Sequence, residues 1–507
     1  MYAKTNSMSI RGIDGIPVSV EVDISTGLPE FSLVGDLSPE VREARERVKT
    51  ALRNSGIDIP SKRITINLAP ADLRKEGTAF DLAIALGILS AMEVLDSEKL
   101  KRVVIVGELN LDGNVCPVPG VLPMVIAAKE ENFSACVVPE ANAFEAAMVE
   151  GIKIIPANNL LDVITMFQKG HPIKYFDSQS LKNKDETYDV DFSEVNGQLT
   201  MRRAAEVAAA GMHNILFIGS PGSGKTMIAR RIPTILPDLT CEEALEVTRI
   251  YSVSGLTSAA SPIKKARPFR SPHHTISSAS LIGGGKNPKP GEVSLADRGV
   301  LFLDELPEFQ KNVLESLRQP LEDRRVSVVR INGSNTFPAN IMLCSAMNPC
   351  RCGYYPDRNK CQCSESEVRR YMQRISRPLL DRIDICVEAP PVGYRDLESK
   401  SVNESSAEIR KRVKDAWDIQ GERFKGTNVI FNSQMKPSLI KKYCKLEKED
   451  ETMMESAFEK MNLSARGYHR ILKVARTIAD LAGSENVKRG HLLEALSYRS
   501  IEEKIWG

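Results

Sequence analysis

Residues 219–226 form a glycine-rich stretch whose residue types and spacing could bind phosphate. The stretch follows the apolar segment ILFIG and precedes the segment MIARRI, which is the strand–loop–helix context of a phosphate-binding loop. Its glycines let backbone N–H groups converge on phosphate oxygens at the positive end of a helix dipole. We expect Lys225 to reach the β- and γ-phosphates of ATP, and the Thr226 hydroxyl to ligate Mg²⁺. The predicted nucleotide-binding residues are Gly219, Ser220, Pro221, Gly222, Ser223, Gly224, Lys225 and Thr226.

Two carboxylates, Asp304 and Glu305, follow directly on the apolar segment GVLFL. Ligands of open α/β sheets bind at the carboxyl ends of the strands, so this pair is well placed to meet the same nucleotide. We expect Asp304 to lie on the Mg²⁺ side and Glu305 to act as the base that orients the attacking water. Without the phosphate loop, two acids at a strand end would more often be a solvated cap.

A third apolar segment, IMLCSAM, ends in Asn348 followed by proline. An asparagine at a strand tip beside the γ-phosphate could hydrogen-bond the attacking water and report the presence of that phosphate. The Asn-Pro pair could equally form a turn. The residues alone leave these two interpretations open.

Four cysteines crowd into fourteen positions, as two C-x-C pairs separated by eight residues: Cys350, Cys352, Cys361 and Cys363. Four thiolates on one short loop can close a tetrahedral Zn²⁺ shell. The spacing is tighter than the usual C-x₂-C, and a set of free loop thiols is the alternative. Exposed free cysteines invite oxidation, so we favour a small zinc-binding knuckle directly after Asn348.

These residues need two α/β regions and a helical region to position them. Apolar strands are predicted at 64–69, 102–110 and 135–139, with an amphipathic helix and a buried helix between them. The polar stretch that follows lacks periodicity and is interpreted as a linker. We therefore expect an α/β fold with the organisation 1–168 (N-terminal domain), 169–190 (linker), 191–395 (ATPase core) and 396–507 (C-terminal helical domain).

The composition is that of an ordinary soluble protein of 507 residues, with 42% hydrophobic and 26% charged residues. The formal net charge is 68 − 66 = +2, which excludes a histone-like polycation. The chain has no run of eighteen apolar residues, and its N-terminus lacks the apolar core of a signal peptide. We expect a cytoplasmic protein with no membrane partner.

Taken in order, the phosphate loop, the Asp-Glu pair and Asn348 resemble the Walker A, Walker B and sensor-1 elements of an AAA+ ATPase. The segments RPFRSPHHTISSASLIGGG, PGEVSLADRGVLFLDELPEF and RPLLDRIDI are similar to the magnesium-chelatase-like family of bacterial AAA+ ATPases, the YifB/ComM group. The resemblance implies a nucleotide-dependent homo-hexamer. It also implies that Arg382 is the arginine finger and Arg466 the sensor-2 residue, with Arg470 as competitor. For each arginine, a surface salt bridge is the alternative.

The first domain resembles the proteolytic domain of Lon, a ribosomal protein S5 domain 2-like fold. Lon carries its nucleophilic serine in KDGPSAG, where this chain has KEGTAFD and places Ala79 at the serine position. The later Lon lysine lies in PxGGLK, where this chain has Leu122. A Ser–Lys dyad needs both a hydroxyl and an amine, and Thr78 is displaced by one residue. We therefore expect an assembly or binding domain without peptidase activity.

The segment RRVSVVRINGSNTFPA alternates around Asn332-Gly333, which predicts a hairpin just before the sensor-1 strand. Arg330 near its tip could meet a DNA backbone through a sequence-independent contact, or the hairpin could simply be solvated. The family includes a hexameric helicase that promotes branch migration in natural transformation, and this favours DNA. The alternatives are a protein remodeller and a metal-insertion motor; DNA structure and polarity cannot be predicted from the sequence.

Overall fold

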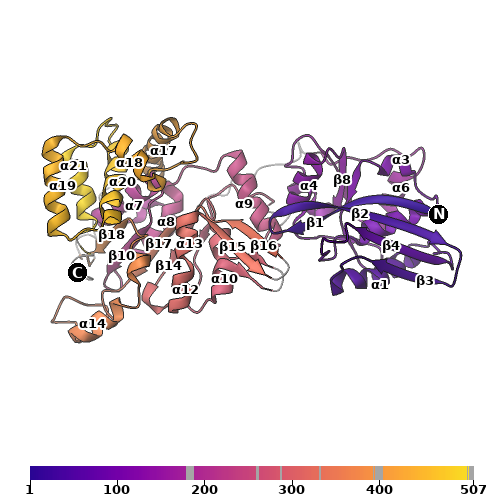
Figure 1. Cartoon of the computed structure of the whole chain (residues 1–507), viewed down its shortest axis with the longest axis horizontal. Helices are drawn as coiled ribbons and strands as arrows, with labels where there is room; N and C mark the ends of the chain where they lie inside the picture. The colour runs from indigo at the N-terminus through magenta and orange to yellow at the C-terminus, as the bar shows by residue number, and fades with distance from the viewer. Residues whose placement is uncertain are drawn as a thin grey trace. The chain divides into compact units, whose positions relative to one another are not determined.

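The computed structural model describes residues 1–177, 188–257, 262–285, 288–330, 333–391, 393, 403–499 and 501. The chain divides into two compact units (Figure 1). Unit 1 comprises Met1–Asp185 and Cys241–Lys264, and unit 2 comprises Glu186–Thr240 and Lys265–Gly507. The expected α/β fold class is confirmed, because each unit is built on a mixed set of strands and helices.

Unit 1 contains a seven-stranded sheet in the order β3-β4-β2-β1-β5-β8-β9. The long strands β1 and β2 pair antiparallel, whereas β5, β8 and β9 run parallel. Its strands are β1 (Tyr2–Arg11), β2 (Asp14–Ser25), β3 (Glu30–Val34), β4 (Arg63–Ala69), β5 (Val103–Ile105), β8 (Ala135–Pro139) and β9 (Lys153–Ala157). A small hairpin of β6 (Glu108–Leu109) and β7 (Val115–Cys116) lies beside them. The predicted strands at 64–69 and 135–139 are confirmed.

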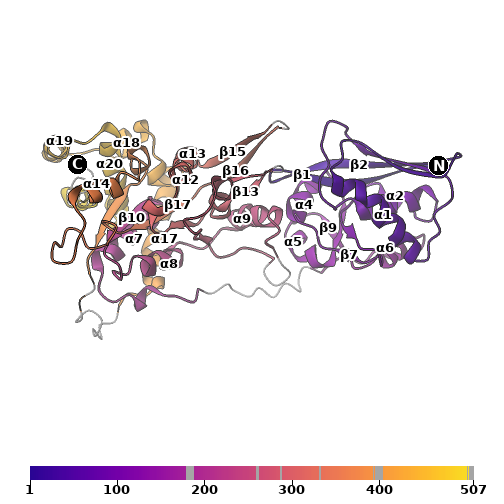
Figure 2. The same ribbon diagram turned by 90° about the horizontal axis from the view of Figure 1, so that it is seen from below.

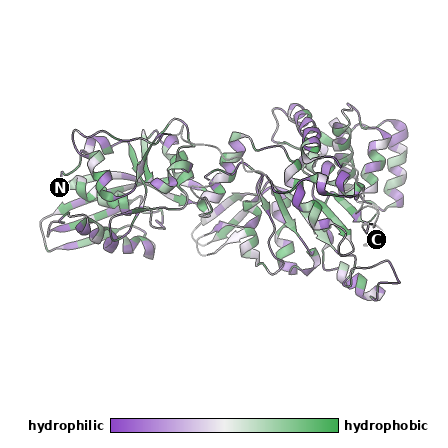
Figure 3. Cartoon of the chain, turned by 180° about the vertical axis from the view of Figure 1, so that it is seen from behind, coloured by the Kyte–Doolittle hydropathy of each residue, from purple (hydrophilic) through white to green (hydrophobic). Residues whose placement is uncertain are grey.

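The helices of unit 1 cover this sheet as their patterns predict. Helix α1 buries one stripe of five residues, whereas every residue of α2 is buried, as expected for an amphipathic and a core helix. Figure 3 shows hydrophobic residues on the strands and hydrophilic residues on the outer faces of several helices. The helices are α1 (Pro39–Asn54), α2 (Asp81–Ala91), α3 (Ser97–Leu100), α4 (Val121–Glu130), α5 (Ala143–Ala146), α6 (Leu160–Phe167) and α9 (Cys241–Val253).

Helix α9 belongs to unit 1 although it lies far along the sequence from the rest of that unit. It packs on α4, and Leu245 joins the apolar cluster that contains Leu122. The N–H of Gly120 donates to the Ser252 carbonyl at 2.9 Å, and Arg249 pairs with Asp14. The segment Cys241–Lys264 is thus attached to unit 1 by both apolar and polar contacts.

Unit 2 is built on a five-stranded parallel sheet in the order β11-β14-β17-β10-β18. The strands are β11 (Phe269–Arg270), β14 (Val300–Leu303), β17 (Met342–Met347), β10 (Ile215–Gly219) and β18 (Ile385–Ala389). Because β14, β17 and β10 are neighbours and run parallel, the loops after these three strands share one edge of the sheet. A separate two-stranded antiparallel sheet is formed by β12 (Gly283–Gly284) and β13 (Lys289–Pro290).

The helices of unit 2 surround this sheet and continue into a helical C-terminal region. Helices α7 and α8 pack on the sheet, and α17 packs on both of them. The helices are α7 (Leu199–Gly211), α8 (Lys225–Ile235), α10 (Ser278–Ile282), α11 (Glu292–Leu295), α12 (Lys311–Ser316), α13 (Arg318–Asp323), α14 (Glu365–Met372), α15 (Arg377–Leu380), α17 (Ser406–Arg423), α18 (Pro437–Tyr443), α19 (Lys448–Lys460), α20 (Ala465–Leu481) and α21 (Arg489–Ser497).

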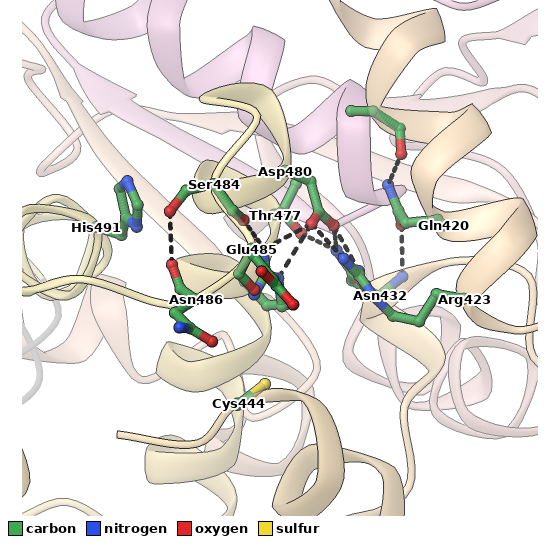
Figure 4. A network of polar contacts seen from close by, with 12 residues as sticks. Gln420, Arg423, Asn432, Cys444, Thr477, Asp480, Ser484, Glu485, Asn486 and His491 are labelled. Carbon is green, nitrogen blue, oxygen red and sulfur yellow. Dashed lines mark hydrogen bonds and ion pairs between the residues drawn. The ribbon is translucent and has the colours of Figure 1, made fainter. Parts of the chain in front are cut away.

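A buried carboxylate, Asp480, organises polar contacts among the C-terminal helices (Figure 4). It accepts hydrogen bonds from Arg423 on α17, from Asn432, and from Arg476 on its own helix. Arg476 is only 2% exposed and also donates to two carbonyls of the following turn. Fully satisfied buried charges of this kind fix the helices in one arrangement.

The hairpin predicted around Asn332-Gly333 is confirmed by the antiparallel pairing of β15 (Arg325–Arg330) with β16 (Gly333–Pro338). Figure 2 shows the two strands running side by side away from the five-stranded sheet. Asn332 lies outside the described residues, as does the side chain of Arg330. No described helix is both long and apolar enough to cross a bilayer.

Candidate nucleotide-binding site

The glycine-rich loop joins the end of β10 to the start of α8, as predicted. Gly222 and Gly224 have φ angles of 75° and 81°, in the left-handed region that favours glycine. At Gly219 a side chain is excluded for another reason, since a Cβ atom there would lie 2.3 Å from the Ala389 carbonyl oxygen of β18. The loop therefore has the curvature that lets backbone N–H groups face a phosphate.

Lys225 lies folded over the phosphate loop. Its Nζ atom donates to the carbonyl oxygens of Gly219 and Ser220 at 2.7 and 2.8 Å. It also lies 3.3 Å from the Asn348 side-chain oxygen at the tip of β17. Burial lowers the pKa of Lys225, while the charge of Asp304 opposes this shift. The ammonium group is thus already within the loop that is expected to hold phosphates.

Thr226 and Asp304 meet at the first turn of α8, where the Thr226 hydroxyl donates to an Asp304 carboxylate oxygen at 2.8 Å. Mg²⁺ takes oxygen ligands from one or two side chains and completes its shell with phosphate and water. A hydroxyl and a carboxylate in direct contact, beside a phosphate loop, are a donor set that fits this ion. The second Asp304 oxygen accepts the backbone N–H of Glu305 at 2.9 Å.

Glu305 adopts a left-handed backbone conformation, with φ of 52°, at the turn that follows β14. Its side chain is 58% exposed, so its carboxylate can meet solvent water. His274 is a neighbour that the sequence analysis missed: its Nδ1 atom lies 3.7 Å from the Glu305 carboxylate. The ring of His273 stands against the His274 ring at 4.1 Å between centroids. The available signal was the His-His pair soon after β11.

The two predicted family arginines lie in different surroundings. The guanidinium of Arg382 donates to the carbonyls of Arg318 and Pro378 at 3.0 and 2.6 Å and pairs with Glu322. The described contacts of Arg382 include none with its own phosphate loop. Arg466 lies exposed in the first turn of α20.

Arg470, the competitor for the sensor-2 position, lies one turn beyond Arg466 and is only 5% exposed. It hydrogen-bonds the segment around Arg382, as detailed below. Gln198 precedes α7 with φ of 51° and donates to the Pro390 carbonyl at 2.7 Å. This contact joins the start of α7 to the end of β18.

The four predicted cysteines converge, with all four sulfur atoms within 4.8 Å of one another. The sulfur of Cys350 lies 3.3 Å from that of Cys352 and 3.7 Å from that of Cys361. A tetrahedral zinc shell with Zn–S bonds of about 2.3 Å has sulfur–sulfur separations of roughly 3.8 Å, so the cluster has the dimensions of a metal site. Backbone hydrogen bonding from Tyr354 lowers the pKa of Cys352 to about 6, whereas burial raises the pKa of Cys361 to about 12. The sulfur positions, and not these pKa values, indicate the metal site.

The cysteine knuckle, residues 350–363, touches the phosphate loop through Gly353. A Cβ atom at Gly353 would lie 2.5 Å from the ring of Pro221. Gly353 has φ of 88° and its N–H closes a turn onto the Cys350 carbonyl at 3.0 Å. The sequence analysis did not predict this contact, because nothing in the local pattern joins residue 353 to residue 221.

In unit 1, Ala79 and Leu122 lie in one buried apolar cluster. Ala79 and Leu122, which correspond to the Lon serine and lysine, thus lie in the same cluster. Neither carries the hydroxyl or the amine that a Ser–Lys dyad needs. The nearby Thr78 hydroxyl is bound to the Glu108 carboxylate. A carboxylate is a poor base for a threonine hydroxyl, so this contact does not replace the missing dyad.

Comparison with known protein families gives three matches that together span most of the chain. The model described as "Magnesium chelatase, subunit ChlI" matches residues 191–397. "Subunit ChlI of Mg-chelatase" matches residues 20–142, and "Magnesium chelatase, subunit ChlI C-terminal" matches residues 403–499.

Individual relatives extend over nearly the whole length. The chain is 42% identical over 502 residues to competence protein ComM of Haemophilus influenzae, which covers 98% of this chain and 97% of that protein. It is 42% identical over 498 residues to YifB of Escherichia coli, covering 97% and 96%. A shorter match, 33% identical over 118 residues, joins 23% of this chain to 18% of an archaeal Lon protease of Methanocaldococcus jannaschii.

Proposed function

The chain belongs to the magnesium-chelatase-like AAA+ proteins of the YifB/ComM type, and from this membership we propose that it is an ATP-hydrolysing motor that acts on DNA. Its fold combines a Lon-protease-like N-terminal domain, an AAA+ core and a C-terminal helical domain. Family membership implies ATP and Mg²⁺ as cofactors. The proposal concerns what this ATPase core drives.

The observation that supports hydrolysis is the convergence of Lys225, Thr226, Asp304 and Asn348 at one edge of the sheet. Lys225 would bind the β- and γ-phosphates, and Thr226 with Asp304 would hold Mg²⁺. The ion would neutralise charge on the phosphate oxygens. Glu305, exposed at the same edge, would orient the attacking water, and Asn348 would hydrogen-bond that water or the γ-phosphate.

We propose a nucleotide-dependent hexamer in which Arg382 serves the pocket of the neighbouring subunit and Arg466 serves its own. An arginine finger stabilises the charge that develops on the transferred phosphoryl group. The absence of described contacts between Arg382 and its own phosphate loop favours action in trans. The exposed guanidinium of Arg466 is better suited than the buried Arg470 to contact a bound nucleotide.

DNA is proposed as the substrate because a relative that matches almost the full chain is named a competence protein. The expected activity is branch migration in support of transformation or recombination, in the cytoplasm, with sequence-independent contacts to the DNA backbone. The hairpin of β15 and β16 is proposed to make those contacts. The decisive measurement is the ATPase rate with single-stranded, duplex and branched DNA, repeated at rising salt. Stimulation that weakens with salt supports the proposal.

Two other functions remain as alternatives with observations of their own. The Lon-like unit without a nucleophile would suit a protein remodeller, and stimulation of ATP hydrolysis by an unfolded protein instead of DNA would favour it. The family descriptions name a magnesium chelatase, so a metal-insertion motor is the other alternative. ATP hydrolysis that responds to a porphyrin-like macrocycle, and to neither polymer, would favour that reading.

We also propose that the cysteine knuckle holds one Zn²⁺ ion through Cys350, Cys352, Cys361 and Cys363. The sulfur separations support this, since they match a tetrahedral thiolate shell. The ion would have a structural role, because four protein ligands leave no open position for a substrate.

A further inference from the structure

The loop that carries Arg382 runs from the end of α15 to the start of β18, and Arg470 of α20 is bound to it on both sides of Arg382. One terminal nitrogen of Arg470 donates to the carbonyls of Leu380 and Ile383 at 3.1 and 2.9 Å. The other donates to the Asp381 carboxylate at 2.8 Å. Arg470 is therefore committed to residues 380–383, and its 5% exposure leaves it little access to a nucleotide.

A further contact of α20 fixes Asp384, the last residue before β18, through His213. Thr477 lies two turns beyond Arg470 and hydrogen-bonds His213 at 2.8 Å. The other His213 ring nitrogen lies 3.1 Å from the Asp384 carboxylate. Asn214 donates to the Arg382 carbonyl at 2.7 Å, so the backbone of Arg382 is also held by the residue that follows His213.

The side chain of Arg382 is 14% exposed and pairs with Glu322. Its partner Glu322 is 56% exposed, so a stronger anion brought by a second subunit can compete for the guanidinium. The reach of Arg382 then depends on the position of its Cα atom. A displacement of about 1 Å in a group that acts on the transition state can lower a rate about 10²-fold.

We propose that Arg470 is a positioning residue for Arg382: it holds the 380–383 loop so that Arg382 can act on the nucleotide of the neighbouring subunit. This inference rests on the proposed role of Arg382 in trans. It would join two functions on one helix, because α20 carries both Arg466, proposed above to serve its own pocket, and Arg470, which is bound to the 380–383 loop. The defect caused by losing Arg470 should therefore appear in the neighbour's pocket.

Mixing of subunits tests this directly. Arg470→Gln should bind a fluorescent ATP analogue with unchanged affinity and hydrolyse ATP about 10²-fold more slowly than the unaltered chain. Adding Lys225→Ala subunits should restore activity, because an intact pocket of the Arg470→Gln subunit then faces an intact Arg470 and Arg382. Arg466→Gln is the matched control: its pocket is damaged in cis, so mixing it with Lys225→Ala should restore nothing.

Arg382→Ala mixed with Lys225→Ala is the benchmark for action in trans. Recovery with Arg382→Ala but not with Arg470→Gln overturns the positioning role and leaves the arginine finger in place. Failure of both pairs overturns the trans role of Arg382, and the inference with it. If Arg470→Gln lowers the melting temperature or prevents assembly, Asp381→Asn replaces it, since it removes the negative charge that pairs with Arg470 and keeps the buried guanidinium. Recovery on mixing is again the expected result, and its absence overturns the inference.

Discussion

Lys225 and Glu305 are expected to fail in different ways when replaced. Lys225→Ala removes the ammonium that lies in the phosphate loop, so nucleotide binding should be impaired. Glu305→Gln keeps the size of the side chain but removes its basicity, so ATP should bind and hydrolysis should slow by about 10²–10⁴-fold. Binding of a fluorescent ATP analogue and release of phosphate measure the two effects separately. Normal turnover by Glu305→Gln would place the base at another residue.

His274 gives a second test of the same pocket, because its Nδ1 atom lies 3.7 Å from the Glu305 carboxylate. We expect His274→Asn to hydrolyse ATP more slowly and to bind ATP with unchanged affinity, because the histidine would act through the Glu305 carboxylate. An unchanged rate of hydrolysis would contradict this role. The sequence could supply the residues proposed to bind phosphate, because the whole loop motif lies in eight consecutive positions. It could not supply His274, since its contact with Glu305 joins loops after two different strands.

Asp384 predicts a pH dependence of stability. Burial raises its pKa, but the hydrogen bond and charge of His213, with Lys473 and Arg470, outweigh this, so its pKa lies below the ordinary 3.8. A carboxyl with a depressed pKa stabilises the fold above its unfolded pKa, and this contribution is lost as the pH falls through the folded pKa. Asp384→Asn should cost roughly 1.5–3 kcal/mol at pH 7. The difference in melting temperature between the two proteins should shrink below pH 3.8. A difference that stays constant into acid would contradict the ion-pair account.

At the scale of elements, the cysteine knuckle should behave as one cooperative metal site. Purified protein prepared without chelator should contain about one zinc per chain, and Cys→Ser at any of the four positions should remove most of it, because an incomplete thiolate shell binds far more weakly. Cys444→Ser is the matched control, since that buried thiol lies outside the knuckle. Metal analysis that finds no zinc in the unaltered protein would leave a set of free thiols.

The contact between Gly353 and Pro221 predicts that the knuckle affects nucleotide binding. A methyl group at Gly353 would overlap the Pro221 ring and force either the knuckle or the phosphate loop to move. Overpacking of this kind costs about 1–3 kcal/mol, so Gly353→Ala should weaken ATP binding about tenfold. Gly426→Ala is the control: its φ of 78° imposes a similar backbone strain, but a Cβ there meets no atom within 4 Å. Equal ATP affinity of the two variants would show that the contact has no influence on the pocket.

The elements themselves were largely predictable from the sequence. The strand β10 begins and ends where the apolar segment does, and β14 and β17 differ from their predicted bounds only at the ends. The spacing and number of apolar residues distinguish α1 from α2. Helix α1 is buried on one side only, whereas α2 is buried on all sides. Such patterns record burial, and burial is a local property of each segment.

The contacts of Arg470 could not be predicted from the sequence in the same way. Its spacing from Arg466 places both arginines near one face of α20, and a pattern cannot say which of them finds a carboxylate. The answer depends on Asp381, which lies 89 residues earlier in the chain. Long-range pairing of polar side chains leaves no periodic trace in either segment, so the sequence left two candidates, which the structure places in different surroundings.

At the scale of the whole molecule, the discontinuity of unit 1 predicts the behaviour of a cleaved chain. A protease site engineered between Asp177 and Tyr188, once cut, should leave two fragments that elute together under native conditions. The reason is that α9, carried by the second fragment, folds with α4 of the first. Leu245→Asp in the same cleavable chain should let the fragments separate, because it puts a charge into their shared apolar cluster. Separation without that substitution would contradict the assignment of α9.

The placement of α9 also has a consequence for how such proteins can be recombined. A crossover near residue 190 would exchange the first stretch of unit 1 and leave its α9 behind, facing an α4 from another parent. Arg249 would then need an acid at the position of Asp14, and Leu245 a matching apolar surface. A functional chimaera must transplant two separate pieces of the gene, so the N-terminal unit is inherited as a pair of segments and not as a detachable cassette.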